Sequence, residues 1–218
     1  MTNTDSNRHN GQVAIVTGST KGIGAGVAKQ LAHEGATVVV NGRSAKPGMA
    51  TVDAIRDSGG EAAFIQADMR DPTAIEELID ETADRFGRID ILVNNAGVQT
   101  ETTATEATVE DWEFVLETDF RSFWLCAKHA VEHMPEGSAI VNMSSNHAFL
   151  TMPGLFPYNA VKAGINGMTR ALALELGPLG IRVNTINPGW VEVERTQDEL
   201  SEDDRARIEA MHPLDRIG

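Results

Sequence analysis

Short apolar runs alternate along the chain with longer stretches in which apolar residues recur every three to four positions. The short runs predict strands over residues 12–17, 37–41, 62–67, 89–94, 139–143 and 181–186. The amphipathic stretches predict helices over residues 23–34, about 47–57, 72–86, 108–133 and 157–176, with an acidic helix over 201–211. Because the predicted strands are apolar along their length, they indicate a parallel sheet covered on both faces.

The alternation of strands and helices predicts an α/β fold. Right-handed crossovers between parallel strands give a doubly wound, Rossmann-type sheet with helices on both faces. Asp71 and Pro72 are typical of a helix start, and Gly87 and Gly177 are typical of helix ends. Ser44 is a candidate cap for the second helix.

The length of 218 residues fits one domain. We expect residues 1–10 to form a disordered polar tail and residues 11–218 to form a single folded domain. The chain stops at residues 212–218 without a closing strand. We therefore expect a C-terminal strand to be missing and the physiological chain to be longer, since an uncovered edge strand invites pairing with another chain.

Charge and composition narrow the possible partners. The chain carries 18 Lys and Arg against 32 Asp and Glu, a formal net charge of −14, which repels phosphate backbones and anionic lipids. We therefore expect no nucleic-acid partner and no membrane partner. The single cysteine, Cys126, fits a reducing compartment, and we see neither a secretory signal nor an apolar run as long as a membrane span. The sequence thus predicts a cytoplasmic protein.

The first predicted strand runs into a glycine-rich segment at residues 17–24, TGSTKGIG. Gly18, Gly22 and Gly24 allow a sharp turn and let a pyrophosphate approach the amides at the start of the next helix. A position between the first strand and the first helix is the context in which such a segment binds a dinucleotide. The other interpretation is a glycine-rich turn without a ligand.

The second predicted strand ends in NGRS at residues 41–44, without the carboxylate that binds the ribose 2′-hydroxyl of NAD. Arg43, with Thr20 and Lys21 of the first loop, provides groups that suit a 2′-phosphate. We therefore expect NADP(H) to be favoured over NAD(H). The alternative is that Arg43 is a solvated loop residue.

A tyrosine and a lysine lie one helical turn apart. Tyr158 and Lys162 are spaced i and i+4, on one face of the predicted helix over 157–176. A neighbouring ammonium favours the phenolate form of a tyrosine, which suits acid/base chemistry. Ser145, at the end of the strand that leads into this helix, provides a hydroxyl that can polarise a substrate oxygen.

Together these segments resemble the short-chain dehydrogenase/reductase family over nearly all of residues 11–218. The matching motifs, in the family's order and spacing, are TGSTKGIG at 17–24, Asp68, NNAG at 94–97, Ser145, Tyr158 with Lys162, and NPG at 187–189. The resemblance implies that residues 11–218 form a dinucleotide-binding catalytic domain. It also implies hydride transfer between a nicotinamide and a carbonyl/alcohol pair.

The resemblance implies a role for each matching residue. Tyr158 is the proton donor and acceptor, Lys162 favours its ionised form and holds the nicotinamide ribose, and Ser145 binds the reacting oxygen. The implied cofactor-binding residues are Gly18, Thr20, Lys21, Gly22, Ile23, Gly24, Arg43, Asp68, Met69, Asn95, Ala96, Gly97, Tyr158, Lys162, Pro188, Gly189 and Val191. Asp68 and Met69 contact the adenine, and residues 188–191 pass over the nicotinamide.

Two positions depart from the family pattern. Asp119 stands where the family usually has the asparagine of its catalytic tetrad. We expect it to be a catalytic position that has an added negative charge and lacks the amide donor. Near Val193, where the family often has a threonine that helps to hold the cofactor, the sequence is WVEVE at 190–194.

Two histidine signals have ordinary explanations. His129, Glu132 and His133 match the zinc-protease pattern H-x-x-E-H, but no third ligand is evident, so we expect a solvated helix end and no metal. His147, two residues beyond Ser145, is either a plain loop residue or a substrate ligand. The expected walls of the substrate pocket are Phe149, Leu155, Phe156 and Trp190.

The sequence therefore predicts an NADP(H)-dependent oxidoreductase with Tyr158 as its acid/base. Its predicted substrate is a 3-oxoacyl thioester, a sugar or polyol, or a small ketone. The alternative is a dinucleotide-binding module without turnover, because a fold does not guarantee chemistry. We also expect a homo-oligomer, a tetramer or dimer, packed through the long helices over 108–133 and 157–176.

Overall fold

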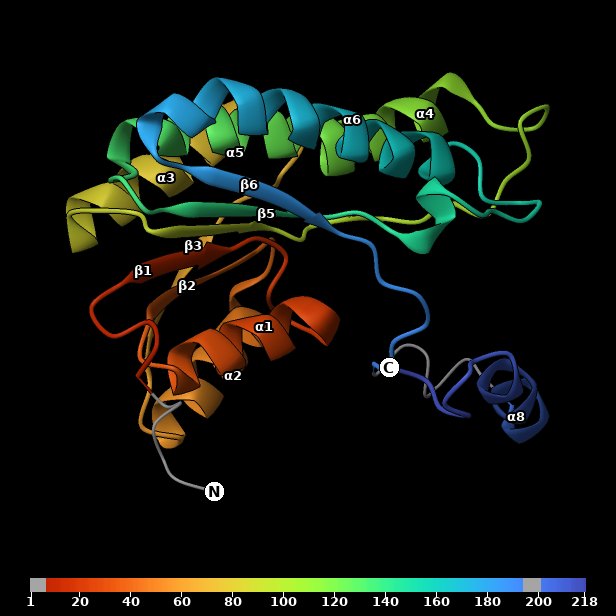
Figure 1. Cartoon of the computed structure of the whole chain (residues 1–218), viewed down its shortest axis with the longest axis horizontal. Helices are drawn as coiled ribbons and strands as arrows, with labels where there is room; N and C mark the ends of the chain where they lie inside the picture. The colour runs from red at the N-terminus through yellow and green to blue at the C-terminus, as the bar shows by residue number, and fades with distance from the viewer. Residues whose placement is uncertain (1–6, 194–200) are drawn as a thin grey trace.

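Six parallel strands form one sheet in the computed structural model, which describes residues 7–193 and 201–218 (Figure 1). The strands are β1 (Val13–Val16), β2 (Thr37–Gly42), β3 (Glu61–Gln66), β4 (Ile91–Asn94), β5 (Ala139–Met143) and β6 (Arg182–Ile186). Their order across the sheet is β3-β2-β1-β4-β5-β6. Successive strands are added in one direction from β1 to β3 and in the other from β4 to β6, and a crevice lies between β1 and β4, outside their carboxyl ends. The predicted doubly wound fold is confirmed.

Helices cover both faces of the sheet (Figure 1). On one face lie α1 (Gly22–His33) and α2 (Ala45–Asp57). On the other face lie α3 (Pro72–Phe86), α4 (Val109–Val115), α5 (Ser122–Ala130) and α6 (Tyr158–Leu176), while α8 (Glu202–Ala210) lies beside these layers. Among the helices of the described ranges, none is both long and apolar enough to cross a membrane.

Each face of the sheet has its own apolar cluster. Val40 of β2 packs with Ala28 of α1 and Val52 of α2, and Leu92 of β4 packs with Cys126 of α5 on the opposite face. Successive residues of a strand point to opposite faces, so a strand buried on both sides has to be apolar throughout. Burial also raises the pKa of the Cys126 thiol to about 12.

Capping residues set the start and the end of α3. The Asp71 side chain accepts a hydrogen bond from the Thr73 N–H at 2.9 Å, and Pro72 occupies the first turn. Gly87, with a φ of 80°, ends the helix in the left-handed region. Ser44 stands at the N-cap position of α2, but its side chain makes no capping hydrogen bond. Ser44 is therefore the N-cap residue by position, as predicted, although its side chain contributes no cap.

α6 ends at the predicted residue, and a short turn extends beyond it. Gly177 has a φ of −54°, and the chain continues through the 3-10 turn Gly177–Leu179. Pro178 fixes its own φ near the helical value and so carries the turn on. Gly180, with a φ of 74°, ends the turn. The α-helix therefore ends at Leu176 with Gly177 as its C-cap residue, as predicted, and the 3-10 turn that follows was not predicted.

The predicted helix over 108–133 is continuous but changes its pitch. Thr108 caps α4 through a reciprocal pair of hydrogen bonds with Asp111. α4 passes into the π-helical turn η1 (Leu116–Arg121), continues as α5 and ends in the 3-10 turn η2 (Val131–His133). The π-helical turn was not predicted. It carries Asp119, whose exposed fraction is 0%, and such wide turns are frequent at functional sites.

Part of the expected polar tail is ordered against the fold. The His9 N–H donates a hydrogen bond to the Glu34 carbonyl at 2.9 Å, and the His9 ring lies 2.6 Å from the Gln12 side-chain oxygen. The expectation of a disordered tail is therefore wrong for residues 7–10. Residues 1–6 lie outside the described residues.

Strand β6 forms one edge of the sheet. In the described chain it pairs only with β5, in a register that places Val183 opposite Ile140. No further strand follows it in residues 187–193 or 201–218. The crevice at the carboxyl ends of the strands is therefore bounded on this side by the loop after β6.

Candidate active site

Two neighbouring cavities open at the carboxyl ends of the strands. The first, of about 510 Å³, lies over the loops that follow β1, β2, β3 and β4. The second, of about 930 Å³, lies over the loops that follow β4, β5 and β6 and the start of α6. Seven residues line both cavities: Lys21, Ile23, Asn95, Gly97, Val98, Phe114 and Val193. The two cavities therefore form one continuous crevice.

Every predicted catalytic and cofactor-binding residue lines one of these cavities. The first is lined by Gly18, Thr20, Lys21, Gly22, Ile23, Gly24, Arg43, Asp68, Met69, Asn95, Ala96 and Gly97. The second is lined by Asp119, Ser145, Tyr158, Lys162, Pro188, Gly189 and Val191. The fold thus places most of the predicted dinucleotide-binding residues in the first cavity, and the predicted catalytic residues with Pro188, Gly189 and Val191 in the second, beside it.

The three glycines of the first loop are required for different structural reasons. A Cβ on Gly18, whose φ is +62°, would lie 2.7 Å from the Ala96 Cα, and a Cβ on Gly24 would clash with the Asn95 side-chain amide. These two glycines therefore permit close packing against the loop after β4. At Gly22, whose φ is +58°, the nearest atom to a Cβ would be in Val193 at 3.7 Å. Only Gly22 leaves space on the side of the cavity.

Neutral side chains hold the glycine loop in place. The Thr17 hydroxyl accepts hydrogen bonds from the N–H groups of Asn95 and Ala96, each at 3.0 Å. The Asn95 amide donates to the carbonyls of Thr17 at 2.9 Å and Gly18 at 3.1 Å. The loops after β1 and β4 are therefore joined without any charged group.

Asn41 is a site residue that the sequence analysis missed. Its side-chain oxygen accepts a hydrogen bond from the Gly18 N–H at 3.3 Å, and its amide donates to the Ile65 carbonyl at 3.2 Å. Asn41 is fully buried at the end of β2. The sequence signal for this role is a polar residue at the end of an otherwise apolar strand. The sequence analysis uses residues 41–44 only as positions that lack a carboxylate.

Two arginines, Arg43 and Arg70, line the first cavity. Arg70 pairs with Asp68 at 2.8 Å, and the Arg70 guanidinium holds the pKa of this carboxyl below its usual range, with a smaller contribution from Arg43. The Arg70 guanidinium also lies 5.5 Å from the centre of the Phe114 ring. Arg70 lines the cavity and was not predicted from the sequence, because its neighbours carry no motif.

The first cavity fits a dinucleotide on this geometry. α1 starts at Gly22, and Lys21 at its N-cap position makes no side-chain capping hydrogen bond. The positive end of the α1 dipole therefore faces the cavity, where it favours a pyrophosphate. Arg43, Thr20 and Lys21 line the same cavity.

The catalytic candidates gather in the second cavity. Tyr158 begins α6, and the Lys162 ammonium, one turn later, lies 5.4 Å from the centre of the Tyr158 ring. Ser145 lies two residues after the end of β5, and its hydroxyl accepts a hydrogen bond from the His147 N–H at 3.2 Å. A hydroxyl, a phenol and an ammonium from β5 and α6 thus line one cavity.

Lys162 is held by a buried ion pair. Its Nζ lies 3.0 Å from Oδ2 of Asp119 and donates to the Met143 carbonyl at 3.1 Å. The other carboxylate oxygen of Asp119 accepts a hydrogen bond from the Val98 N–H at 2.8 Å. Burial raises the pKa of the Asp119 carboxyl above its usual range, and the Lys162 ammonium opposes this increase.

Gly97 makes room for the ion pair. A Cβ at this position would lie 2.8 Å from Asp119 Oδ2 and 3.4 Å from Lys162 Nζ. The glycine of the NNAG segment therefore permits the carboxylate and the ammonium to meet beside the loop after β4.

The loop after β6 closes the second cavity. The Asn146 N–H donates to the Pro188 carbonyl at 2.9 Å, which ties this loop to the segment that carries Ser145. Val193, where the family often has a threonine, lines both cavities. Residues 194–200 lie outside the described residues.

The expected pocket walls are correct in part. Leu155 and Trp190 line the second cavity. Phe149 is 71% exposed and lines neither cavity, and Phe156 packs against Trp112 at a ring distance of 5.7 Å. His147 also lines the second cavity, with its ring 6.3 Å from the Tyr158 ring.

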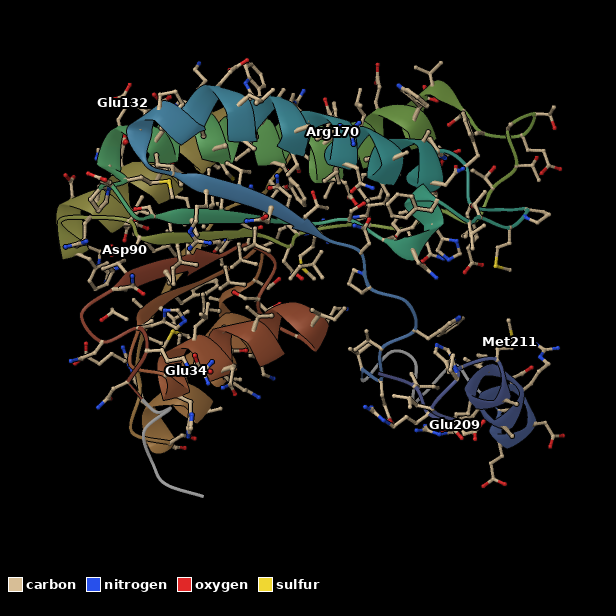
Figure 2. All side chains as sticks on the ribbon, viewed as in Figure 1. Glu34, Asp90, Glu132, Arg170, Glu209 and Met211 are labelled. Atoms are coloured by element: carbon tan, nitrogen blue, oxygen red, sulfur yellow. The ribbon has the colours of Figure 1, made fainter. Side chains whose placement is uncertain are left out.

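The H-x-x-E-H segment lies away from both cavities. His129 Nδ1 is 3.7 Å from a Glu76 carboxylate oxygen, and His133 Nε2 is 3.9 Å from an Asp80 carboxylate oxygen. Glu132 lies at the outer surface of the helical layer (Figure 2). Both histidines therefore face acidic residues of α3.

Comparisons with known proteins agree with this arrangement. A family model described as enoyl-(acyl carrier protein) reductase matches residues 18–218. The (2S)-[(R)-hydroxy(phenyl)methyl]succinyl-CoA dehydrogenase subunit BbsD of Thauera aromatica is 38% identical over 209 residues, which are 95% of this chain and 84% of that protein. A 3-oxoacyl-[acyl-carrier-protein] reductase of Synechocystis sp. is 37% identical over 190 residues, 86% of this chain and 77% of that protein.

Solved structures lead to the same class. A short-chain dehydrogenase from Burkholderia cenocepacia in complex with NADP matches with a TM-score of 0.90 at 36% identity, over 97% of this chain and 86% of that chain. The fold and these relatives define an oxidoreductase of the dinucleotide-binding α/β class. The chain belongs to the short-chain dehydrogenase/reductase family, whose members are NAD(P)-dependent oxidoreductases.

Proposed function

We propose that the chain is an NADP(H)-dependent reductase or dehydrogenase that interconverts a carbonyl and an alcohol. The observation that supports this most strongly is the placement of Ser145, Tyr158 and Lys162 around one cavity that continues into the glycine-loop cavity. The residues of the glycine loop and the start of α1 would hold the pyrophosphate of the dinucleotide. When bound, the nicotinamide supplies a hydride to the carbonyl carbon or accepts one from the alcohol carbon.

The chain's own residues move and stabilise the proton. In carbonyl reduction the Tyr158 hydroxyl gives its proton to the substrate oxygen, and the alcohol forms as the carbon gains the hydride. The Ser145 hydroxyl donates a hydrogen bond to the same oxygen. The Lys162 ammonium stabilises the phenolate that remains on Tyr158. In alcohol oxidation each of these transfers runs in reverse.

The preference for NADP(H) follows from charges in the first cavity. Arg43 and Lys21 line it, and the one carboxylate among its lining residues, Asp68, is already paired with Arg70. A 2′-phosphate at this end meets more positive than negative charge. The NADP complex of the Burkholderia relative supports the same choice. We also propose that Asp68 and Met69 contact the adenine and that residues 188–191 pass over the nicotinamide.

The substrate is a 3-oxoacyl thioester, a sugar or polyol, or a small ketone. The Synechocystis relative is named a 3-oxoacyl-[acyl-carrier-protein] reductase, and the Thauera relative is named a (2S)-[(R)-hydroxy(phenyl)methyl]succinyl-CoA dehydrogenase subunit. Both names favour a thioester.

The second candidate function is dinucleotide binding without turnover. The Asp119–Lys162 ion pair favours it, because Asp119 engages the ammonium that the catalytic role of Tyr158 requires. Turnover by the purified protein decides between the two candidates.

The test is cofactor turnover across a panel of the three substrate classes, with NADPH and NADH side by side. Tyr158→Phe should remove nearly all turnover while dinucleotide affinity stays within a few fold, since binding depends on the glycine loop and Lys162. A Phe variant that keeps most of its kcat rules out Tyr158 as the acid/base. A wild type that binds both cofactors and turns over no member of the panel supports the binding module.

We further propose that the protein is a homo-oligomer, a tetramer or dimer, packed through the long helices. On these helices Trp112, Trp124 and Leu174 are 38%, 48% and 80% exposed. Large apolar side chains that are exposed on the same helical layer are typical of a protein–protein contact surface. Light scattering should give a mass of two or four chains, and a stable, active monomer would contradict this proposal.

A further inference from the structure

Asp119 places a buried carboxylate on the ammonium that lies over the Tyr158 ring. Asp119 is 0% exposed, and its partner Lys162 is 4% exposed. The π-helical turn carries Asp119 inward, and Gly97 leaves the space in which its Oδ2 meets Lys162 Nζ at 3.0 Å. Such a site excludes water, so the two charges act on their surroundings with little screening.

We propose that Asp119 is a positioning residue whose buried ion pair offsets the positive charge that Lys162 presents to Tyr158, so that Tyr158 ionises at a higher pH than it would beside Lys162 alone. This inference rests on the proposed function, because it takes Tyr158 as the acid/base. The family's usual asparagine carries no charge, so the offset is a property of this chain's own residue.

The direction follows from simple electrostatics. An unpaired ammonium 5.4 Å from the Tyr158 ring centre would stabilise the phenolate. A carboxylate bonded to that ammonium repels the phenolate and cancels part of the stabilisation. The proposal takes Asp119 as the carboxylate, since one of its oxygens lies 3.0 Å from the ammonium and the other accepts the Val98 N–H, and both contacts oppose the effect of burial.

The geometry also fixes Lys162 in one place. Its ammonium donates to the Met143 carbonyl at 3.1 Å and lies 5.8 Å from the centre of the Phe123 ring. The Ser144 hydroxyl donates to the Lys162 backbone carbonyl at 2.7 Å. Because both ends of Lys162 are held, neutralising Asp119 should change the charge beside Tyr158 more than the position of the ammonium.

Other titratable groups face the same cavity. In the described chain they are Lys21 of the first loop, Glu101 and Glu106 of the loop after β4, and His147 of the segment after β5. The His147 ring lies 6.3 Å from the Tyr158 ring. These groups remain in place when Asp119 is changed, so a difference between two variants at position 119 isolates the Asp119 charge.

The sequence offers a direct measurement, because Tyr158 is the single tyrosine of the chain. The near-ultraviolet absorbance change from phenol to phenolate therefore titrates Tyr158 alone, in the protein without cofactor or substrate. Asp119→Asn should lower the midpoint of this titration by about one pH unit, the size expected for removal of one nearby charge. The alkaline rise of kcat for alcohol oxidation should move by a similar amount.

Matched variants control for fold and total charge. Tyr158→Phe should abolish the absorbance change. Glu117→Gln removes a carboxylate from the same π-helical turn, where Glu117 pairs with Arg121 at 2.8 Å and is 34% exposed, and should leave the midpoint unchanged. Asp90→Asn removes a buried carboxylate paired with Arg88 at the opposite end of the sheet (Figure 2), and should also leave it unchanged.

A second pair of variants covers the case in which Asp119→Asn does not fold. Lys162→Met should raise the midpoint, and Asp119→Asn in the Lys162→Met background should lower it again. The proposal is overturned if the midpoint is the same with Asp or Asn at position 119 in the backgrounds that fold, or if Asn raises it. This outcome is distinct from failure of the proposed function, which would show as turnover by Tyr158→Phe whatever the titration gives.

Discussion

The two ends of the crevice are held by different kinds of interaction. Neutral groups fix the glycine loop: the Thr17 hydroxyl and the amides of Asn41 and Asn95 bond backbone atoms of neighbouring strand ends. A buried ion pair, Asp119 with Lys162, fixes the catalytic end. Neutral hydrogen bonds do not titrate, whereas a buried ion pair depends on the protonation of both partners. The glycine loop should therefore keep its geometry over a wide pH range, and pH should act mainly through the catalytic end.

The comparison is tested most strongly by removing one partner of the ion pair. Lys162→Met leaves the Asp119 carboxylate buried without a cation and should lower the free energy of unfolding by about 3–5 kcal/mol at neutral pH. Burial raises the pKa of Asp119 and the Lys162 ammonium opposes this increase, so the pKa should rise further when Lys162 is removed. A carboxyl with a raised pKa in the folded state stabilises most when protonated, so the loss should grow as the pH rises through that pKa.

Urea unfolding of wild type and variant between about pH 5 and pH 8 measures this loss. The double variant Asp119→Asn with Lys162→Met is the control, because it leaves no buried charge and should regain most of the stability. Equal losses in the single and double variants, or a loss independent of pH, would show that Asp119 is not ionised in the native protein.

The glycine loop should respond to shape alone. Gly18→Ala places a Cβ 2.7 Å from the Ala96 Cα at a φ of +62°, and should cost about 2–4 kcal/mol of stability at any pH, from left-handed strain and overpacking. Gly26→Ala is the control: a Cβ there meets no atom within 4 Å, and a helical alanine in place of glycine should add up to about 1 kcal/mol. Thermal unfolding with dinucleotide titration compares the two, and equal stabilities would contradict the packing role of Gly18.

The smallest expected effect concerns a charged side chain in the cofactor half, Arg43. Arg43→Ala should weaken NADPH binding by about 1.5–3 kcal/mol, since a charge-assisted contact to phosphate is lost, and should leave NADH binding unchanged. Lys29→Ala removes the same charge from an exposed position of α1 that lines neither cavity, and should change neither affinity. Equal wild-type affinities for NADPH and NADH would exclude the phosphate role of Arg43.

Much of the fold was predictable because burial on both faces leaves a simple pattern. The strand β5 has the predicted bounds, and the predicted starts and ends of the other strands lie within two residues of the observed ones. The site was predictable in position for a related reason: the motifs follow the strands, and the carboxyl ends of parallel strands meet at one edge. Their chemical roles stay predictions until the variants are measured.

What the sequence did not predict depends on local geometry without a distinctive composition. A π-helical turn has no characteristic residue type and does not visibly interrupt the 3.6-residue apolar period. The sequence therefore did not show that Asp119 lies in such a turn and is buried. Arg70 belongs to no motif, and its importance comes from folding back on Asp68 two residues earlier. Asn41 was visible as a polar strand end, but its bond to the Gly18 N–H needs the register of β1 and β2.

The burial of Cys126 makes this residue a reporter of how the protein opens. A thiol with a pKa of about 12 in a fully buried position does not react with alkylating reagents while α5 stays packed, since the thiolate is the reactive species. Its labelling rate in native buffer should therefore report how often the layer that contains α5 opens. Labelling of the single cysteine thus measures local opening in the half of the molecule that carries Asp119, and no engineered cysteine is required.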